Sequence, residues 1–60
     1  MKTALRKMRQ QRRIKQVELA ARLRLRQNTV AQAEAYGIRK RSTAERYAAA
    51  LGCNWQDLLD

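Results

Sequence analysis

The sequence predicts an all-α fold, a compact bundle of five short helices, and three features of the chain support this prediction. It contains no proline, both glycines stand where a helix is expected to end, and no stretch alternates polar and β-branched apolar residues. A chain of 60 residues buries only about 60% of the surface that it exposes when unfolded. Because the single Cys53 excludes an internal disulfide, stability must come from packed helices or from association with another chain.

The first three helices are predicted from apolar residues spaced three and four positions apart. The first helix is expected at about residues 3–13 and the second at about residues 16–23. The third covers about residues 27–36 and ends before Gly37, which can adopt the left-handed conformation common at helix C-termini.

The last two helices are predicted from residues that favour helix starts. Ser42 followed by Glu45 forms a capping box, which opens a fourth helix that Gly52 ends. Asn54 with Asp57 three residues later opens a short fifth helix. No internal repeat, linker or low-complexity segment interrupts the chain, so we expect a single domain.

Positive charge is concentrated in the first two thirds of the chain. Residues 1–41 hold 13 Lys and Arg against two acidic residues, a balance of +11, whereas residues 42–60 have a balance of −2. One part of the molecule is therefore suited to a polyanion and the other is not. A basic solvated surface is one alternative. A membrane-active basic peptide is another, but it needs one helix with a broad apolar face, and the pattern here breaks into several short helices.

The second and third helices have the features of a helix-turn-helix. They are adjacent, joined by three residues, and surrounded by basic side chains. Two helices that cross steeply over a short turn need a small residue at the crossing point, and Ala20 lies one turn before the end of the second helix. Leu25 is expected to fill the turn, and the shared core is expected to include Leu19, Leu23 and Val30.

This arrangement, Leu-Ala-x-x-Leu-x-Leu-x-x-x-x-Val, resembles the helix-turn-helix of the Cro/phage-repressor (XRE) family. The segment KQVELAARLRLRQNTVAQAE is similar to the central motif of the family, and RYAAALGCNWQDLL is similar to its last two helices. The resemblance covers nearly the whole chain. It implies a lambda-repressor-like DNA-binding domain over residues 1–60, with no room for a separate effector-binding or oligomerisation domain.

The chain departs from the family pattern in the turn and at the helix starts. Arg24 stands where the family usually has glycine, and a non-glycine residue in the left-handed conformation costs about 1 kcal/mol. Lys15 and Arg26 replace the Ser or Thr that usually caps the second and third helices. The Asn-Gly that commonly follows the third helix is absent. Basic residues at helix starts oppose the helix dipole, so they favour a phosphate bound there in a complex; sequence drift is the alternative.

The third helix carries no charged residue on its outward side. Residues 27–38 contain one charged side chain, Glu34, and the outward positions are Gln27, Asn28, Ala31, Gln32 and Ala35. In the major groove, an amide both gives and accepts a hydrogen bond, which suits the edge of adenine, and Ala31 lets the backbone approach the bases. We therefore predict base contacts from Gln27, Asn28 and Gln32. An ordinary polar helix face is the alternative.

Phosphate contacts are expected on the flanks of the third helix, where the DNA backbone would lie. The flanking cations are Arg26, Arg39, Lys40 and Arg41, and the other predicted phosphate contacts are Gln16 at the start of the second helix and Thr29 in the third.

Arg9 and Glu34 are predicted to form an ion pair inside the domain. Arg9 follows Leu5 by four residues, and Glu34 follows Val30 by four, so both lie on inward stripes of their helices. A lone charge that faces a core is costly, whereas a facing arginine and carboxylate satisfy each other. The family resemblance implies the same pair. Extension of both side chains to solvent is the alternative.

The acidic end of the chain is the expected dimer surface. Trp55, Leu58 and Leu59 supply apolar area beside Asp57, and the family resemblance implies that a homodimer forms on DNA through this region. Two recognition helices would then lie about 34 Å apart on a near-palindrome. Without DNA, we expect the dimer to be weak.

These observations predict a cytoplasmic, sequence-specific DNA-binding regulator of transcription, a Cro-like repressor of bacterial or phage origin. An antitoxin or restriction-modification controller of the same fold is one alternative, and an RNA-binding helical module is another. RNA readers usually stack bases on aromatic side chains, and the chain has one Trp, two Tyr and no Phe. No cofactor, metal, small-molecule substrate, membrane association or catalytic activity is expected, since histidine and phosphate-binding glycine loops are absent. Cys53 is expected to be a small buried apolar residue.

Overall fold

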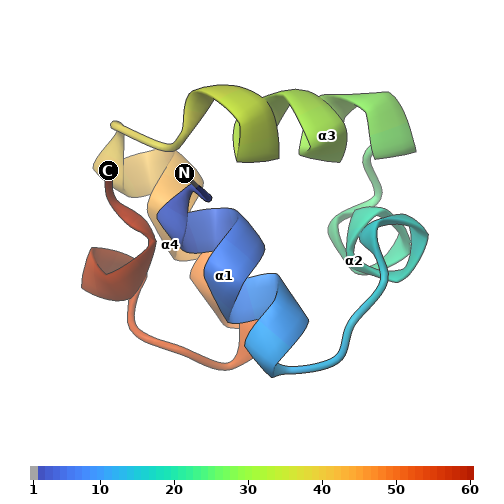
Figure 1. Cartoon of the computed structure of the whole chain (residues 1–60), viewed down its shortest axis with the longest axis horizontal. Coiled ribbons are helices and arrows are strands. Elements are labelled where there is room, and N and C mark those ends of the chain that lie inside the picture. Colours follow the sequence, from blue (N-terminus) through green and yellow to red (C-terminus); the bar gives the residue numbers. More distant parts are fainter. Residues whose placement is uncertain (1) are drawn as a thin grey trace.

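The computed structural model describes residues 2–60, which form four α-helices followed by one 3₁₀ helix (Figure 1). The elements are α1 (Ala4–Gln11), α2 (Gln16–Leu23), α3 (Gln27–Tyr36), α4 (Arg41–Leu51) and the 3₁₀ helix η1 (Trp55–Leu58). Figure 1 shows α3 along one side of the molecule, with α1 and α4 crossing below it and α2 seen nearly end-on near the start of α3. One long side of α3 is therefore left uncovered by the other helices.

The core receives a side chain from every part of the fold. Leu5 of α1, Leu19 of α2, Val30 of α3 and Leu58 of η1 are all 0% exposed. Tyr47 of α4 is 4% exposed. Because residues from α1, α2 and α3 meet in one cluster, this core fixes how α3 is held against the rest of the domain.

The two helices of the predicted helix-turn-helix have the predicted bounds. Ala20 is 3% exposed, as the helix crossing requires, and its carbonyl accepts a hydrogen bond of 2.9 Å from the N–H of Leu25. Arg24 adopts the left-handed conformation, with φ 56° and ψ 39°, so a non-glycine residue does occupy the strained place in this turn. Neither Lys15 nor Arg26 makes a side-chain capping bond, in line with the sequence.

α1 is shorter than predicted. Thr3 is its N-cap, and its hydroxyl accepts a hydrogen bond of 3.4 Å from the N–H of Arg6. The helix ends at Gln11 rather than near residue 13, because Arg13 has φ 56° and turns the chain toward α2. This second left-handed arginine is not predicted by the sequence pattern.

The predictions for the two later helix starts were wrong in detail. α4 begins at Arg41, with Lys40 as its N-cap, so Ser42 lies inside the helix and caps nothing. Glu45 accepts a hydrogen bond of 2.7 Å from Nε of Arg41 instead of returning to the helix start. The predicted fifth helix is a 3₁₀ helix of four residues, and the side chain of its N-cap, Asn54, makes no capping bond.

Candidate nucleic-acid interface

The exposed side of α3 carries the three side chains predicted to read bases. Gln27, Asn28 and Gln32 are exposed, whereas Val30 and Glu34 of the same helix are 0% and 4% exposed. The helical period of 3.6 residues puts Asn28 and Gln32 away from the core, whereas Gln27 lies within about 20° of Glu34 around the axis and is exposed as the first residue of α3. α3 thus presents a row of neutral hydrogen-bonding groups to solvent.

A shallow hollow lies where the starts of α2 and α3 approach each other. Its volume is about 280 Å³, and its lining residues are Gln16, Gln27, Asn28 and Ala31. The small side chain of Ala31 leaves room there for a group that approaches the backbone of α3. The hollow therefore joins the predicted base contacts to Gln16, one of the predicted phosphate contacts.

Three of the predicted phosphate-binding cations make no ion pair or hydrogen bond within the described residues. Arg26, Arg39 and Lys40 are exposed, and within residues 2–60 none of their side chains makes an ion pair or hydrogen bond. Arg26 precedes the first turn of α3, whereas Arg39 and Lys40 follow its last turn. Free positive charge therefore lies at both ends of the neutral face. Thr29, the predicted uncharged contact, is also exposed on α3.

Arg41, the fourth cation, is engaged within the protein. Its guanidinium carbon lies 4.7 Å from the centroid of the Trp55 ring, and its Nε donates to Glu45. A cation over an indole is attracted by the negative face of the ring. The Arg41 side chain remains 69% exposed, so it can reach a ligand only by giving up or sharing these contacts.

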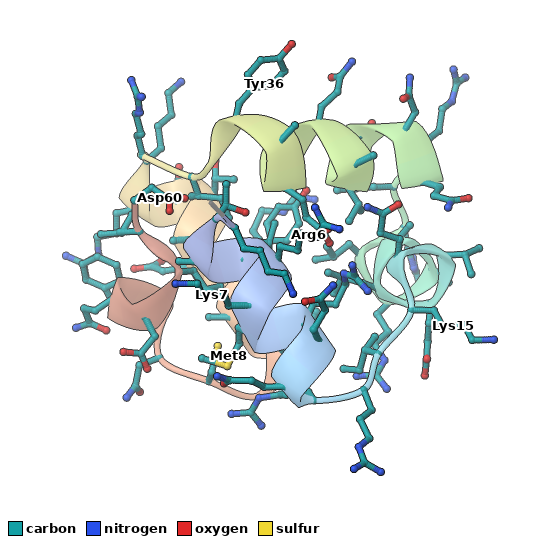
Figure 2. The ribbon with its side chains drawn as sticks, in the orientation of Figure 1. Arg6, Lys7, Met8, Lys15, Tyr36 and Asp60 are labelled. Atoms are coloured by element: carbon teal, nitrogen blue, oxygen red, sulfur yellow. The ribbon has the colours of Figure 1, made fainter. Side chains whose placement is uncertain are left out.

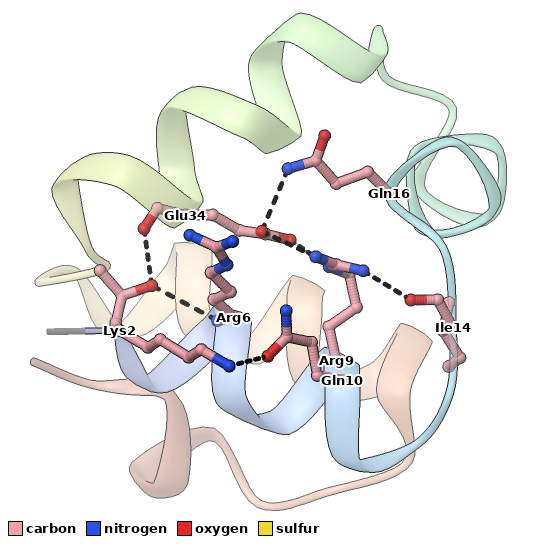
Figure 3. A network of polar contacts seen from close by, with 8 residues as sticks. Lys2, Arg6, Arg9, Gln10, Ile14, Gln16 and Glu34 are labelled. Carbon is pink, nitrogen blue, oxygen red and sulfur yellow. Dashed lines mark hydrogen bonds and ion pairs between the residues drawn. The ribbon is translucent and has the colours of Figure 1, made fainter.

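Gln16 is drawn inward to a buried polar network that Figure 3 shows. Its Nε2 donates to Oε1 of Glu34 over 3.1 Å, and the residue is half-buried. The side-chain N–H groups that would reach a phosphate are thus partly committed to α3. This contact is not predictable from the sequence, because it depends on how closely α2 approaches α3.

Arg9 and Glu34 form the centre of this network. Nε of Arg9 donates to Oε2 of Glu34, and Nη2 donates to Oε1 over 3.1 Å, a two-pronged arrangement. The side chains are 12% and 3% exposed. Nη1 of Arg9 also donates to the carbonyl of Ile14 over 2.8 Å. One arginine therefore ties α1 to α3 and to the loop that leads into α2 (Figure 3).

Asp60 holds the segment that follows α3, a role that the sequence did not suggest. Its Oδ2 accepts from the N–H of Ile38 over 3.2 Å, and its Oδ1 accepts from the N–H of Ala4 over 3.0 Å. Gly37 has φ 86°, and a Cβ there would lie 2.4 Å from Oδ2 of Asp60. Because Arg39 and Lys40 follow directly, these contacts position the basic segment. Only the glycine at position 37 hints at this from the sequence.

The predicted dimer surface is smaller than the sequence suggested. Leu58, one of the predicted interface residues, is 0% exposed in the core of its own chain, so it leaves no free surface for a second copy. Trp55 and Leu59 are half-buried against that core, and of the four predicted interface residues only Asp57 is exposed. Ile38 pairs with Leu59 in an isolated β-bridge, which is why the end of the chain folds back over the core.

The described residues contain neither a cluster of metal ligands nor a membrane-spanning helix. Within residues 2–60, no three His, Cys, Asp or Glu side chains gather closely enough to hold a metal ion. In the same range, no helix has the length and apolar character needed to cross a membrane. Cys53 is half-buried, and burial raises the pKa of its thiol, which disfavours the reactive thiolate.

Comparison with protein families identifies the chain. The model of the Cro/C1-type HTH DNA-binding domain matches residues 4–60, which span every helix described above. Comparison with curated proteins and with solved structures gave no significant match. The family match therefore rests on the whole helical framework, from α1 to η1. The chain belongs to the family of Cro/C1-type HTH DNA-binding domains.

Proposed function

We propose that this chain is a sequence-specific regulator of transcription, a Cro-like repressor that binds a near-palindromic operator in double-stranded DNA. In this proposal α3 enters the major groove and two copies of the chain bind together. The observation that carries the proposal is the exposed neutral face of α3 in a chain of net charge +9. Repression would follow from occlusion of a promoter by the bound dimer.

The chemistry of α3 favours reading bases over binding phosphates. Gln27, Asn28 and Gln32 each offer a donor and an acceptor, and a glutamine or asparagine can make two hydrogen bonds to the edge of adenine. A lysine or arginine at these positions would be drawn to guanine or to the phosphates. The hollow beside Ala31 supports close approach of the helix to the floor of the groove.

The charges around α3 favour phosphate binding on both of its flanks. Arg26 lies at the start of the helix, and Arg39 and Lys40 lie beyond its end, all exposed. The backbone N–H groups in the first turns of α2 and α3 lack side-chain caps, and residues at the starts of both helices line the same hollow. Helix starts attract anions through these N–H groups, and this attraction compensates the cost of placing Lys15 and Arg26 there.

The dimer in this proposal uses what remains exposed around η1. Asp57 and the uncovered parts of Trp55 and Leu59 lie in the acidic third of the chain, which would be repelled by DNA. A two-fold dimer through this region would present two copies of α3 to successive major grooves, about 34 Å apart. The exposed apolar area is small, so we expect the dimer to be weak without DNA.

Selection of bound sites from random duplex DNA tests the proposal. We expect a near-palindromic motif whose half-sites are about 10–10.5 base pairs apart, centre to centre. Footprinting on that motif should show both half-sites filling cooperatively. Protection of a single half-site at saturation, without cooperativity, would reject the dimer. Enrichment of no motif, or tighter binding to single-stranded RNA at the same salt concentration, would reject the proposed function.

A further inference from the structure

Tyr36 is an exposed aromatic residue on the proposed DNA-binding helix that has no role in the fold. It is the last residue of α3 and is 80% exposed. Figure 2 shows its ring pointing away from the body of the protein, beyond the outer side of α3. Within residues 2–60, no hydrogen bond or ion pair involves its hydroxyl. The domain therefore gains little stability from this side chain.

Tyr36 lies on the same face of α3 as two predicted DNA contacts. It follows Gln32 by four residues and Thr29 by seven. At 3.6 residues per turn, these separations put Tyr36 within about 40° of Gln32 and about 20° of Thr29 around the helix axis. All three residues are exposed. A duplex that contacts Gln32 is thus within reach of Tyr36.

The position of Tyr36 along the helix places it beyond the base-reading residues. At 1.5 Å per residue, it lies about 13 Å from Gln27 along the helix axis, whereas the major groove is about 8.5 Å deep. If α3 enters the groove with its first turns, its last turn meets the sugar–phosphate wall. The exposed Arg39 and Lys40, which follow Gly37 and Ile38, are expected at the same wall.

We propose that Tyr36 contacts the sugar–phosphate backbone of duplex DNA, with its hydroxyl donating to a phosphate oxygen and its ring packed on a deoxyribose. The contact carries no base information, because tyrosine that donates to phosphate fixes register and orientation. It extends the interface by one turn and links the neutral face of α3 to the basic segment after it. This inference rests on the proposed function, since it requires that α3 bind duplex DNA.

Chemical nitration tests the contact directly. Tetranitromethane nitrates the phenolate form of exposed tyrosines, and the chain has two tyrosines, of which Tyr47 is 4% exposed. Burial raises the pKa of the Tyr47 hydroxyl, so this residue serves as an unreactive internal control. We expect Tyr36 to be nitrated in the free protein and protected by the selected duplex, as mapped by mass spectrometry.

The same samples separate failure of this inference from failure of the proposed function. If gel-shift assays show no duplex binding, the proposed function fails. If the duplex binds while Tyr36 stays fully reactive, only this inference is overturned. Protection that appears without DNA as the protein concentration rises would assign Tyr36 to contact between copies, and stronger protection by a single-stranded oligonucleotide would assign it to base stacking. Either result overturns the backbone contact.

Two variants and one control complete the test. Tyr36→Phe should lower the affinity of the dimer about a hundredfold for every duplex, about tenfold for each copy, because it removes one hydrogen bond to a charged group from each copy. Tyr36→Ala should lower affinity further, because the ring is also lost. Gln11→Ala, an exposed change at the end of α1, should leave affinity unchanged. Wild-type affinity of Tyr36→Phe, or an altered preferred sequence in Tyr36→Ala, would contradict the proposal, and thermal melts would show that each variant folds.

Discussion

Arg9 and Glu34 join the first helix of the domain to the third through two parallel hydrogen bonds, and both side chains are nearly buried. The pair holds α3 from the side opposite the exposed Gln32. Removing one partner leaves the other as a buried, unpaired charge, which is the costly outcome for such pairs. The orientation of α3 therefore depends on a contact that no DNA would touch.

A double-mutant cycle measures this dependence. We expect Arg9→Met or Glu34→Leu alone to lower the free energy of unfolding by about 3–5 kcal/mol, and the double change to cost much less. The double change should still cost something, because the Ile14 carbonyl loses its donor with Arg9.

Thermal and urea unfolding of the four proteins provide the measurement. A single change of this size could unfold so small a domain, so the cycle is best run with added sucrose, which stabilises compact states. If the two single losses simply add, the two residues do not act as partners.

Salt dependence of binding tests the role of the flanking cations. For a dimer, we expect the logarithm of the association constant to fall with the logarithm of salt concentration at a slope of about −4 to −8. Lys40→Ala should weaken binding to all duplexes about equally and reduce the steepness of the slope by roughly two, one for each copy.

Lys7→Ala is the matched control, because Lys7 is exposed on α1, away from the outer side of α3 (Figure 2). It should leave the slope nearly unchanged. A slope near zero in the wild-type protein, or equal effects of the two lysine changes, would contradict the assigned phosphate contacts.

The uncharged amide side chains of α3 allow a separate prediction about which DNA sequence the protein prefers. Gln27→Ala or Gln32→Ala should relax the preferred motif at one symmetric pair of positions, at a cost of about 1–3 kcal/mol of discrimination for each well-paired amide. Arg39→Ala should lower affinity for every sequence and leave the motif unchanged.

Site selection with the three variants compares these effects, and melting temperatures should stay close to that of the wild-type protein because all three residues are exposed. If both glutamine variants keep the parental motif, specificity comes from DNA shape rather than from these amides.

The two glycines of the chain make a matched pair for testing how the basic segment is held. Gly37→Ala should lower the free energy of unfolding by at least about 1–3 kcal/mol, since φ is 86° and ψ is 168° there and the added Cβ would strike the Asp60 carboxylate. Gly52→Ala should cost only about 1 kcal/mol, because non-glycine residues can also adopt its left-handed conformation. The added Cβ would lie 3.9 Å from the nearest atom, Nη1 of Arg12, and would therefore clash with nothing.

Chemical denaturation of both variants decides between these expectations. Equal losses would mean that the Asp60 carboxylate moves aside without cost and does not position the basic segment. Asp60→Ala should reproduce part of the Gly37→Ala loss, because it frees the N–H groups of Ala4 and Ile38.

Much of the fold could be predicted because it depends on local periodicity. The bounds of α2 and α3 and the inward positions of Arg9 and Glu34 follow from the helical repeat. The start of α4 could not be predicted in the same way, because Glu45 has two possible partners and the structure pairs it with Arg41 rather than with the helix start.

The candidate site likewise has one part that the sequence predicts and another part that depends on tertiary packing. Exposure of Asn28 and Gln32 on α3 follows from the position of the core, so the sequence was sufficient to locate that face. The Gln16–Glu34 hydrogen bond joins residues that are 18 positions apart in the sequence, and the contacts of Asp60 span 22 positions or more. Both therefore depend on tertiary packing. The exposure of Tyr36 was also unpredictable, since it depends on where the last turn of α3 leaves the core.

The stacking of Arg41 on Trp55 gives the domain an intrinsic optical probe. The chain has one tryptophan, so its fluorescence has a single source, and a cation lies over that source. Any event that draws Arg41 toward a phosphate would change the electric field on the indole and hence the colour and intensity of its emission. A phosphate bound at Arg41 would thereby be reported by Trp55, in the acidic part of the chain, without a label.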